Sequence, residues 1–402
     1  MVNSTDTTQQ NRFIDQRILK GDLNLKSTWG LARDNIKCLK PCLHGGKIWE
    51  TEKQTNLTRE EIVDFSSNVN PLGSSQKALE AIRNNLGQIP IYPDSTSASL
   101  REAIADSFEG ISLNNVVVGS GSTELIYLFA DTFLEKGEVA LIPAPTFGEY
   151  ENAVRKAGGK PRHIRLPRNF CVESSIFTRD MKDANIAFLC NPNNPTSILT
   201  PYDTLIEIIE EALEEDVLLF LDEDFLDFVD EEKQVSLIGE IKEYPNLFVL
   251  RSFTKVFGLT GLRIGYGIAS EETARILSNA KIPWNVNCLA QVAALAALTD
   301  VEHLKKSREL VRTERAYLTR ELMRINSFKP YPADANFILI DIKESGFTAA
   351  QLKKKMLKQG ILIRDCSSFR GLDDYHIRVA VKTRQENERL LETFTKVVEK
   401  SV

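Results

Sequence analysis

A chain of 402 residues with 42% apolar and 26% charged residues has the length and composition of a globular protein with a large buried core. Its formal net charge of −6 disfavours nucleic acid and anionic membrane surfaces as main partners. No apolar run approaches the ~20 residues that cross a bilayer, and the polar N-terminus lacks the apolar stretch of a secretory signal.

The six cysteines do not show the paired spacing of a metal site. Two of them lie close together, but no second pair of cysteine or histidine residues accompanies them. We therefore expect no metal centre, and we expect reduced thiols in a cytoplasmic protein. The cysteines are Cys38, Cys42, Cys171, Cys190, Cys288 and Cys366.

Residues 1–36 are polar and without periodic pattern, which predicts a mobile or loosely docked extension. From about residue 81 to 285, short apolar runs alternate with helical patterns. This alternation predicts a large α/β domain with a mostly parallel sheet of the seven-stranded type and helices on both faces. The expected strands are 116–118, 139–142, 186–190, 217–221 and 247–250, and the first two are followed by helices at 122–134 and about 150–157.

Residues 286–402 have a different pattern. We expect a smaller α/β domain here, completed by residues 37–80 from the other end of the chain. Its expected elements are a long helix at about 290–324, a strand at 335–341, a helix at 349–359, strands at 361–364 and 377–381, and a helix at 384–400. Ligands of open α/β sheets bind beyond the carboxyl ends of the strands, where most of the motifs below fall.

The segment Gly119-Ser120-Gly121-Ser122-Thr123-Glu124 follows an expected strand and opens an expected helix. Its small residues allow backbone N–H groups to approach an anion, and the helix dipole favours negative charge there. A plain strand-to-helix turn would have a similar sequence. The dinucleotide-binding pattern of three spaced glycines is not present.

Two further segments follow buried strands. Asn191-Pro192-Asn193-Asn194-Pro195-Thr196 is a rigid turn rich in donors, and it is also compatible with an ordinary turn. Asp222 ends a strand that has no other polar residue. A buried carboxylate needs a cationic partner, and a protonated pyridine nitrogen is a suitable one. A helix-capping aspartate is the alternative.

The segment from Arg251 to Lys255 places a lysine just beyond a buried strand. Ser252 precedes this lysine by three residues and Arg263 follows it by eight, so both could hold a phosphate. A lysine amine that is held near a carbonyl group can form a Schiff base with it. Together these segments predict a phosphate cradle, a partner for a pyridinium nitrogen and an amine.

In this order, the motifs resemble those of the fold-type I pyridoxal-phosphate enzymes, the aspartate aminotransferase superfamily. The resemblance spans about residues 43–399. It implies that Lys255 binds pyridoxal 5′-phosphate as a Schiff base and moves protons, that Asp222 pairs with the ring nitrogen and that Asn194 bonds the ring hydroxyl oxygen. It further implies that Phe147 stacks on the ring, and that Tyr92 reaches a phosphate across the interface of a homodimer. The implied phosphate ligands are Ser120, Gly121, Ser122, Ser252 and Arg263.

Two positions depart from the family pattern without removing an essential group. Phe225 stands where many relatives carry a tyrosine that reaches the ring oxygen. Ser197 replaces the usual glycine after the Asn-Pro-x-Asn-Pro-Thr motif.

Within this superfamily, the chain is most similar to the threonine-phosphate decarboxylases of cobalamin biosynthesis. The similarity implies decarboxylation of O-phospho-L-threonine to 1-aminopropan-2-yl phosphate, or of O-phospho-L-serine to ethanolamine phosphate, for the cobalamin nucleotide-loop linker. Four segments carry it: His44-Gly45-Gly46, residues 64–73 with Asn68, residues 283–287, and residues 363–380 with Arg364 and Arg378. Lys47 departs from the asparagine usual there.

The similarity implies that Arg378 binds the substrate carboxylate, while Arg364, His44, Gly46 and Asn68 lie around the substrate phosphate. A bidentate arginine–carboxylate pair suits the first role. The alternative enzyme is an aminotransferase of the histidinol-phosphate type. A transcription regulator with this fold would need an upstream DNA-binding domain, and residues 1–36 are too short and not basic enough for one. The sequence does not distinguish phosphothreonine from phosphoserine, because the two differ by one methyl group.

Overall fold

The computed structural model describes residues 27–46, 48–55, 57–230 and 236–399. The described residues fall into two units, the first ending at Lys40 and the second beginning at Pro41. In the first unit, the described part of the expected extension forms two short helices, α2 (Thr28–Leu31) and α3 (Asp34–Lys37); residues 1–26 lie outside the described residues, as does Lys47 in the second unit. In the ranges given above, no helix is long and apolar enough to span a membrane.

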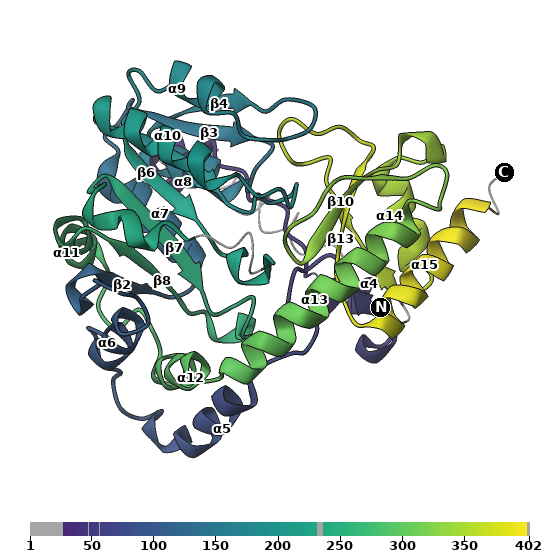
Figure 1. Ribbon diagram of the computed structural model, residues 1–402, viewed down its shortest axis with the longest axis horizontal. Coiled ribbons are helices and arrows are strands. Elements are labelled where there is room, and N and C mark those ends of the chain that lie inside the picture. Colours follow the sequence, from purple (N-terminus) through teal and green to yellow (C-terminus); the bar gives the residue numbers. More distant parts are fainter. Residues whose placement is uncertain (1–26, 47, 56, 231–235, 400–402) are drawn as a thin grey trace, which may run out of the picture. The chain divides into compact units, whose positions relative to one another are not determined.

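A seven-stranded, mostly parallel sheet with helices on both faces organises the second unit, as the sequence predicted (Figure 1). Six strands run in the same direction, while β8 is antiparallel to both of its neighbours, β2 and β7. In spatial order the strands are β2 (Val116–Gly119), β8 (Gly265–Ala269), β7 (Leu247–Ser252), β6 (Leu218–Asp222), β5 (Ile186–Cys190), β3 (Val139–Ala144) and β4 (Lys160–Arg165).

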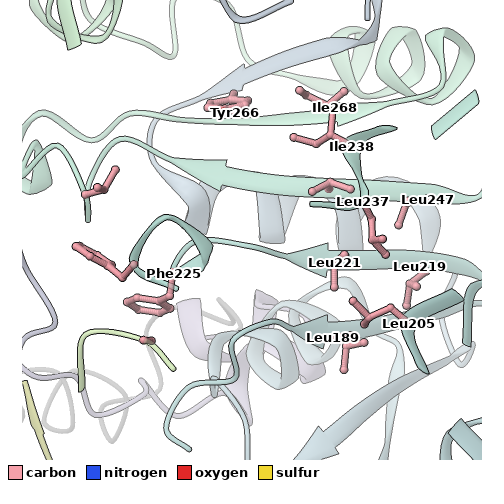
Figure 2. Close-up of a cluster of buried hydrophobic side chains, with 14 of the residues drawn as sticks. Leu189, Leu205, Leu219, Leu221, Phe225, Leu237, Ile238, Leu247, Tyr266 and Ile268 are labelled. Atoms are coloured by element: carbon pink, nitrogen blue, oxygen red, sulfur yellow. The ribbon is translucent and has the colours of Figure 1, made fainter. Parts of the chain in front are cut away.

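The central strands are apolar throughout because both faces of the sheet are covered. Leu219 and Leu221 point into one buried cluster, while Phe220 between them points into the other. Figure 2 shows the first face, where side chains of neighbouring strands meet Leu205 from a helix and Leu237 and Ile238 from a 3-10 segment. This packing fixes the strand ends at which the expected site residues lie.

Helices cover the two faces separately. The second cluster is closed by α7 (Ser122–Phe133), α8 (Glu149–Ala157) and α11 (Glu271–Ala280). The first cluster includes residues of α5 (Gln76–Asn84), α6 (Ala98–Ala105), α9 (Ser174–Arg179), α10 (Tyr202–Glu214), α12 (Cys288–Leu298) and the 3-10 segment η6 (Leu237–Lys242). The 3-10 segments η2 (Leu86–Gln88), η3 (Leu113–Asn115), η4 (Leu226–Phe228) and η7 (Thr260–Leu262) lie in the connections.

A third buried cluster lies around a small four-stranded sheet of order β12-β13-β10-β9. It joins Phe65 from the N-terminal part of this unit to residues 318–394, which supports the expected small domain; its boundaries stay a prediction. The elements are β9 (Lys329–Pro330), β10 (Phe337–Asp341), β12 (Arg364–Asp365), β13 (His376–Ala380), α13 (Val301–Leu322), α14 (Ala349–Leu357), α15 (Arg384–Glu399) and η8 (Lys343–Ser345). The segments α4 (Ile48–Gln54) and η1 (Arg59–Glu61) precede β1 (Val63–Asp64).

The expectation of one long helix at 290–324 was wrong. The chain forms α12 and α13, with a break at Thr299 and Asp300. Asp300 caps α13 by accepting a hydrogen bond from His303 N, and it also accepts one from Ser75 Oγ at 2.6 Å. This partner is 225 residues away in the chain, so a local helical pattern could not reveal the break.

The expected strand at 361–364 is also two strands. Residues Ile361–Leu362 form β11, which pairs in parallel with β1. Arg364–Asp365 form β12, which pairs antiparallel with β13. The chain therefore changes sheets between Leu362 and Arg364, and this change brings Arg364 beside Arg378.

Ser197 occupies a position that favours glycine. Its φ of +64° lies in the left-handed region, and the residue is fully buried. Its hydroxyl compensates by accepting a hydrogen bond from Ala335 N at 2.9 Å. This bond ties the turn after β5 to the segment that enters β10.

Candidate functional site

The loop between β2 and α7 meets Arg263. Gly121 has a φ of +84°, and a Cβ atom there would overlap the Arg263 guanidinium. A Cβ atom at Gly265 would approach Ser122 N at 2.9 Å. The absence of these two side chains lets a guanidinium and backbone N–H groups gather at one helix N-terminus, which is an anion cradle.

Ser252 ends β7, and its side chain is buried. Its hydroxyl oxygen accepts a hydrogen bond from Thr254 N at 2.9 Å and lies 2.6 Å from Thr254 Oγ1. Because β7 and β8 pair at Ser252 and Gly265, the hydroxyl is near the Arg263 segment. The structure thus brings together the predicted phosphate residues of three separate segments.

Asp222 lies at the end of β6 and is 5% exposed. Its Oδ2 atom accepts a hydrogen bond from Tyr150 at 2.6 Å, and its Oδ1 atom accepts one from Asp224 N at 2.9 Å. Burial and, after it, the charge of Asp224 raise the pKa of Asp222 to about 7. A buried carboxylate with such a raised pKa would gain most from a cation placed against it.

Lys255 follows β7 and approaches the same strand end. Its Nζ atom lies 3.9 Å from Asp224 Oδ2 and 5.4 Å from the centre of the Phe225 ring. Phe225 itself is buried and packs edge-on against Phe337 at 5.0 Å. The phenylalanine that replaces the usual tyrosine therefore offers Lys255 an aromatic face.

Asn194 and Phe147 lie on neighbouring segments. Asn194 is buried, and its Oδ1 atom accepts a hydrogen bond from Arg378 Nη1. The Phe147 ring is 5.6 Å from Tyr150 and 5.9 Å from His44. These contacts connect the residues predicted for the cofactor ring to those predicted for the substrate.

Arg364 and Arg378 are register partners in the antiparallel pair of β12 and β13, so their side chains share one face of the sheet. Arg378 donates to Ser66 O at 2.9 Å, and Arg364 donates to Leu43 O at 2.5 Å and Ser368 Oγ at 3.1 Å. Neither guanidinium has a carboxylate within ion-pair distance among the described residues. In the part of the chain that the structure describes, these two buried cations stand side by side without an ion-paired carboxylate.

Burial explains the electrostatics of this pair. Burial, with a further contribution from the charge of Arg364, lowers the pKa of Arg378 to about 10. Burial also lowers the pKa of Arg364. Both shifts mean that the charged forms lack compensation, which a bound anion would supply.

The segment of His44 and Gly46 lies over the same region. His44 Nε2 is 2.7 Å from Glu149 Oε1, and Gly46 N donates to Ser66 Oγ at 2.9 Å. Asn68 is buried, and its Oδ1 atom has no hydrogen-bond partner among the described residues. This oxygen, two residues along the chain from Ser66, whose carbonyl accepts from Arg378, is available to a hydrogen-bond donor of a ligand.

Tyr92 is the exception among the predicted residues. It is 78% exposed, and within the described ranges its ring contacts only Trp284, at 4.8 Å between centres. The single chain does not bring Tyr92 to the other site residues.

Sequence reasoning did not assign a role to three residues that contact the site. Glu149 and Tyr150 belong to the quoted segment of Phe147, and Asp224 comes two residues after Asp222. Asp224 could have been assigned to the site from the sequence, because it lies only two residues after Asp222. The contact of Glu149 with His44 spans 105 positions and had no local signal.

The residues present fit pyridoxal phosphate. The cradle at Gly121 and Arg263 suits a phosphate, the buried carboxylate of Asp222 suits a pyridinium nitrogen, and Lys255 supplies a primary amine. Phe147 provides an aromatic ring beside them.

Comparisons with known proteins agree with this fit. Residues 60–394 match the family described as aminotransferase class I and II. The chain is 33% identical to the histidinol-phosphate aminotransferase of Methanosphaera stadtmanae over 87% of this chain and 94% of that protein. It is 37% identical to a protein of Caldanaerobacter subterraneus subsp. tengcongensis provisionally named threonine-phosphate decarboxylase, over 90% of this chain and 96% of that protein.

Among solved structures, the histidinol-phosphate aminotransferase of Sinorhizobium meliloti in complex with pyridoxal 5′-phosphate superposes with a TM-score of 0.84. The match covers 94% of this chain and all of that chain at 22% identity, and at this identity it supports the fold alone. The family match covers most of the chain and includes the segments of the cradle, of Asp222 and of Lys255. The chain belongs to the class I and II aminotransferase family, and its cofactor is pyridoxal 5′-phosphate.

Proposed function

We propose that the protein removes the carboxylate of an O-phospho-L-amino acid, phosphothreonine or phosphoserine, to form an amino-alcohol phosphate for the cobalamin nucleotide-loop linker. The observation that carries this proposal is the pair Arg364 and Arg378. Two buried guanidinium groups on one face of a sheet, neither with a carboxylate partner in the described chain, suit a substrate with two anionic groups.

On the cofactor side, Lys255 would hold the cofactor covalently and Asp222 would keep the ring nitrogen protonated. Asn194 would bond the ring oxygen, and Phe147 would stack on the ring. The phosphate would be held by Ser120, Gly121, Ser122, Ser252 and Arg263. The contacts of Gly121 with Arg263 and of Tyr150 with Asp222 support these assignments.

On the substrate side, Arg378 would bind the α-carboxylate with its forked guanidinium. Arg364, His44 and Asn68 would bind the distant phosphate, with Gly46 shaping the turn beside them. The His44 contact with Glu149 supports a polar pocket at this corner, where Asn68 would contact the phosphate through its amide N–H groups, because an amide oxygen only accepts hydrogen bonds.

The chemistry depends on which Cα bond is aligned for cleavage. When bound, the cofactor supplies an electron-poor ring that accepts the electrons of the Cα bond perpendicular to it. The anchors of the substrate phosphate would orient the carboxylate into that direction, because a fixed distant group limits rotation about Cα. Lys255 would then donate a proton to Cα.

Histidinol-phosphate aminotransferase activity is the second candidate. The names of relatives such as the Methanosphaera stadtmanae protein favour it. In that reaction the two arginines would serve successive substrates, and the Cα–H bond would be the one aligned for cleavage.

One experiment separates the two candidates. The purified protein with its cofactor is incubated with O-phospho-L-threonine, with O-phospho-L-serine, and with histidinol phosphate plus 2-oxoglutarate. Carbon dioxide release from a phospho-amino acid supports the decarboxylase. Glutamate formation from the third mixture, with no carbon dioxide from the first two, would overturn the decarboxylase proposal. The assignment of the cofactor would be unaffected.

We also propose a homodimer whose sites use residues of both subunits. The Tyr92 ring lies 4.8 Å from that of Trp284, and both side chains are exposed, as are Ile89 and Ile91 close before Tyr92 in the chain and Ile282 close before Trp284; a partner could cover them. Large exposed apolar groups in one region are typical of interaction surfaces. The cytoplasmic location expected from the sequence stays a prediction.

A further inference from the structure

Asp224 is a second buried carboxylate beyond the end of β6, and none of the roles above uses it. Its side chain is 9% exposed, and its Oδ2 atom lies 3.9 Å from Lys255 Nζ. Its Oδ1 atom is buried and has no hydrogen-bond partner among the described residues. Such a carboxylate is costly to bury unless a cation compensates it.

The charges around Asp224 identify that cation. Arg251 already contacts Glu223 and Asp227, and Arg263 lies against Gly121. Within the described ranges, Lys255 is the cation within ion-pair distance of Asp224. The titratable or charged groups that act on this region are Asp222, Asp227, Arg251, Lys255, Arg263, Tyr150 and Cys190.

The charge of Lys255 acts on both neighbouring carboxylates, Asp222 and Asp224. Burial raises the pKa of Asp224, while the charge of Lys255 opposes the rise. Burial also raises the pKa of Asp222, to which Asp224 adds. Asp222 would be compensated by a protonated ring nitrogen held against it, which would leave Lys255 to Asp224. The Phe225 face, 5.4 Å from Nζ, favours the same cationic nitrogen.

We propose that Asp224 is a positioning residue for Lys255: it pairs with the lysine nitrogen, holds it at the end of β6 and keeps it protonated. The inference uses the assignment of Lys255 made under the proposed function. A lysine that donates a proton to Cα must start charged, whereas one that removes a Cα proton must start neutral. A carboxylate beside Lys255 therefore favours the decarboxylase direction.

In decarboxylation followed by protonation at Cα, each bond that forms is matched by a bond that breaks. The carboxylate leaves as carbon dioxide, and its bonding electron pair becomes available at Cα. An N–H bond of charged Lys255 breaks as the Cα–H bond forms, which leaves the amine neutral. Asp224 changes neither its bonding nor its charge, and it acts only through the lysine.

The test is an absorbance titration of the holoenzyme without substrate. The cofactor attached to Lys255 changes its absorbance when the linking nitrogen loses its proton. Asp224→Asn removes the charge at nearly constant shape, and Asp224→Glu keeps it. Asp227→Asn is the matched control, because it removes a nearby charge that contacts Arg251 and Arg308 rather than Lys255.

In the Asp224→Asn protein we expect the pH midpoint of the absorbance change to fall by about one unit or more, because loss of a close opposite charge makes the nitrogen easier to deprotonate. Asp224→Glu should restore most of the difference, and Asp227→Asn should shift less. An unchanged midpoint in Asp224→Asn, or an equal shift in Asp227→Asn, would overturn the proposal. If Asp224→Asn does not hold the cofactor, Asp224→Ser is titrated under the same criteria.

Borohydride fixation followed by peptide mapping tests the Lys255 assignment independently of the role of Asp224. Label on a lysine other than Lys255 would refute the Lys255 assignment. Label on Lys255 with an unchanged midpoint would refute only the role of Asp224. The reaction type is decided by carbon dioxide release, which this titration does not use.

Discussion

His44 Nε2 lies 2.7 Å from Glu149 Oε1, and Tyr127 donates to the other oxygen of the same carboxylate at 2.6 Å. Although burial of Glu149 opposes ionisation, the hydrogen bonds from His44 and Tyr127 outweigh it and lower the pKa of Glu149 below its ordinary value of 4.5. The carboxylate is therefore charged at neutral pH. It holds the imidazole in the pocket predicted for the substrate phosphate.

The first prediction concerns stability. A carboxyl group whose pKa is lowered by folding stabilises the protein above its unfolded pKa, and this contribution is lost as pH falls through the folded value. The melting temperature of the unmodified protein should therefore fall more steeply below about pH 4.5 than that of Glu149→Gln. Glu102→Gln, at an exposed position of α6, is the control and should follow the unmodified protein. Parallel curves for Glu149→Gln and the unmodified protein would contradict this prediction.

The second prediction concerns the attachment lysine. Lys255→Ala should lose the lysine-bound absorbance of the cofactor and all turnover. Lys281→Ala is the matched control, because Lys281 is the other partly buried lysine near the cradle, with Nζ 3.4 Å from Val118 O, and burial lowers its pKa. Borohydride labelling that persists in Lys255→Ala and disappears in Lys281→Ala would reverse the assignment.

Much of this site could be predicted because its motifs follow strand ends, which parallel topology brings to one edge of a sheet. Asp222 ends β6 and Lys255 follows β7, and these two strands are neighbours. The register of Arg364 with Arg378 could not be predicted, since it depends on the change of sheet after β11. The Glu149–His44 and Asp300–Ser75 contacts join distant positions, and one sequence has no local pattern for them.

The third prediction concerns assembly. The protein should be a dimer by light scattering at working concentration, and Tyr92→Phe should weaken cofactor retention, because its hydroxyl is expected to reach the partner's site. Mixing inactive Lys255→Ala with Tyr92→Phe subunits should form hybrid dimers with one repaired site and recovered turnover. Trp284→Phe, which keeps an aromatic ring beside Tyr92, is the control for general disturbance of this surface. A monomer, or mixing without recovery, would contradict the shared site.

The last prediction separates the two arginines. Arg364→Ala removes an anchor of the substrate phosphate, and loss of one partner of a buried charged contact costs about 2–5 kcal/mol. Part of that loss should appear as misorientation, because a freed phosphate no longer fixes the rotation about Cα. The variant should therefore release less carbon dioxide per abortive transamination, measured as accumulation of pyridoxamine phosphate. Arg364→Lys keeps the charge without the fork and should be intermediate. Arg378→Ala should impair both reactions together, because either one requires the carboxylate to be bound. If Arg364→Ala lowers both reactions equally and Arg378→Ala changes their ratio, the two roles are exchanged, and Arg378 is the residue that fixes the rotation about Cα.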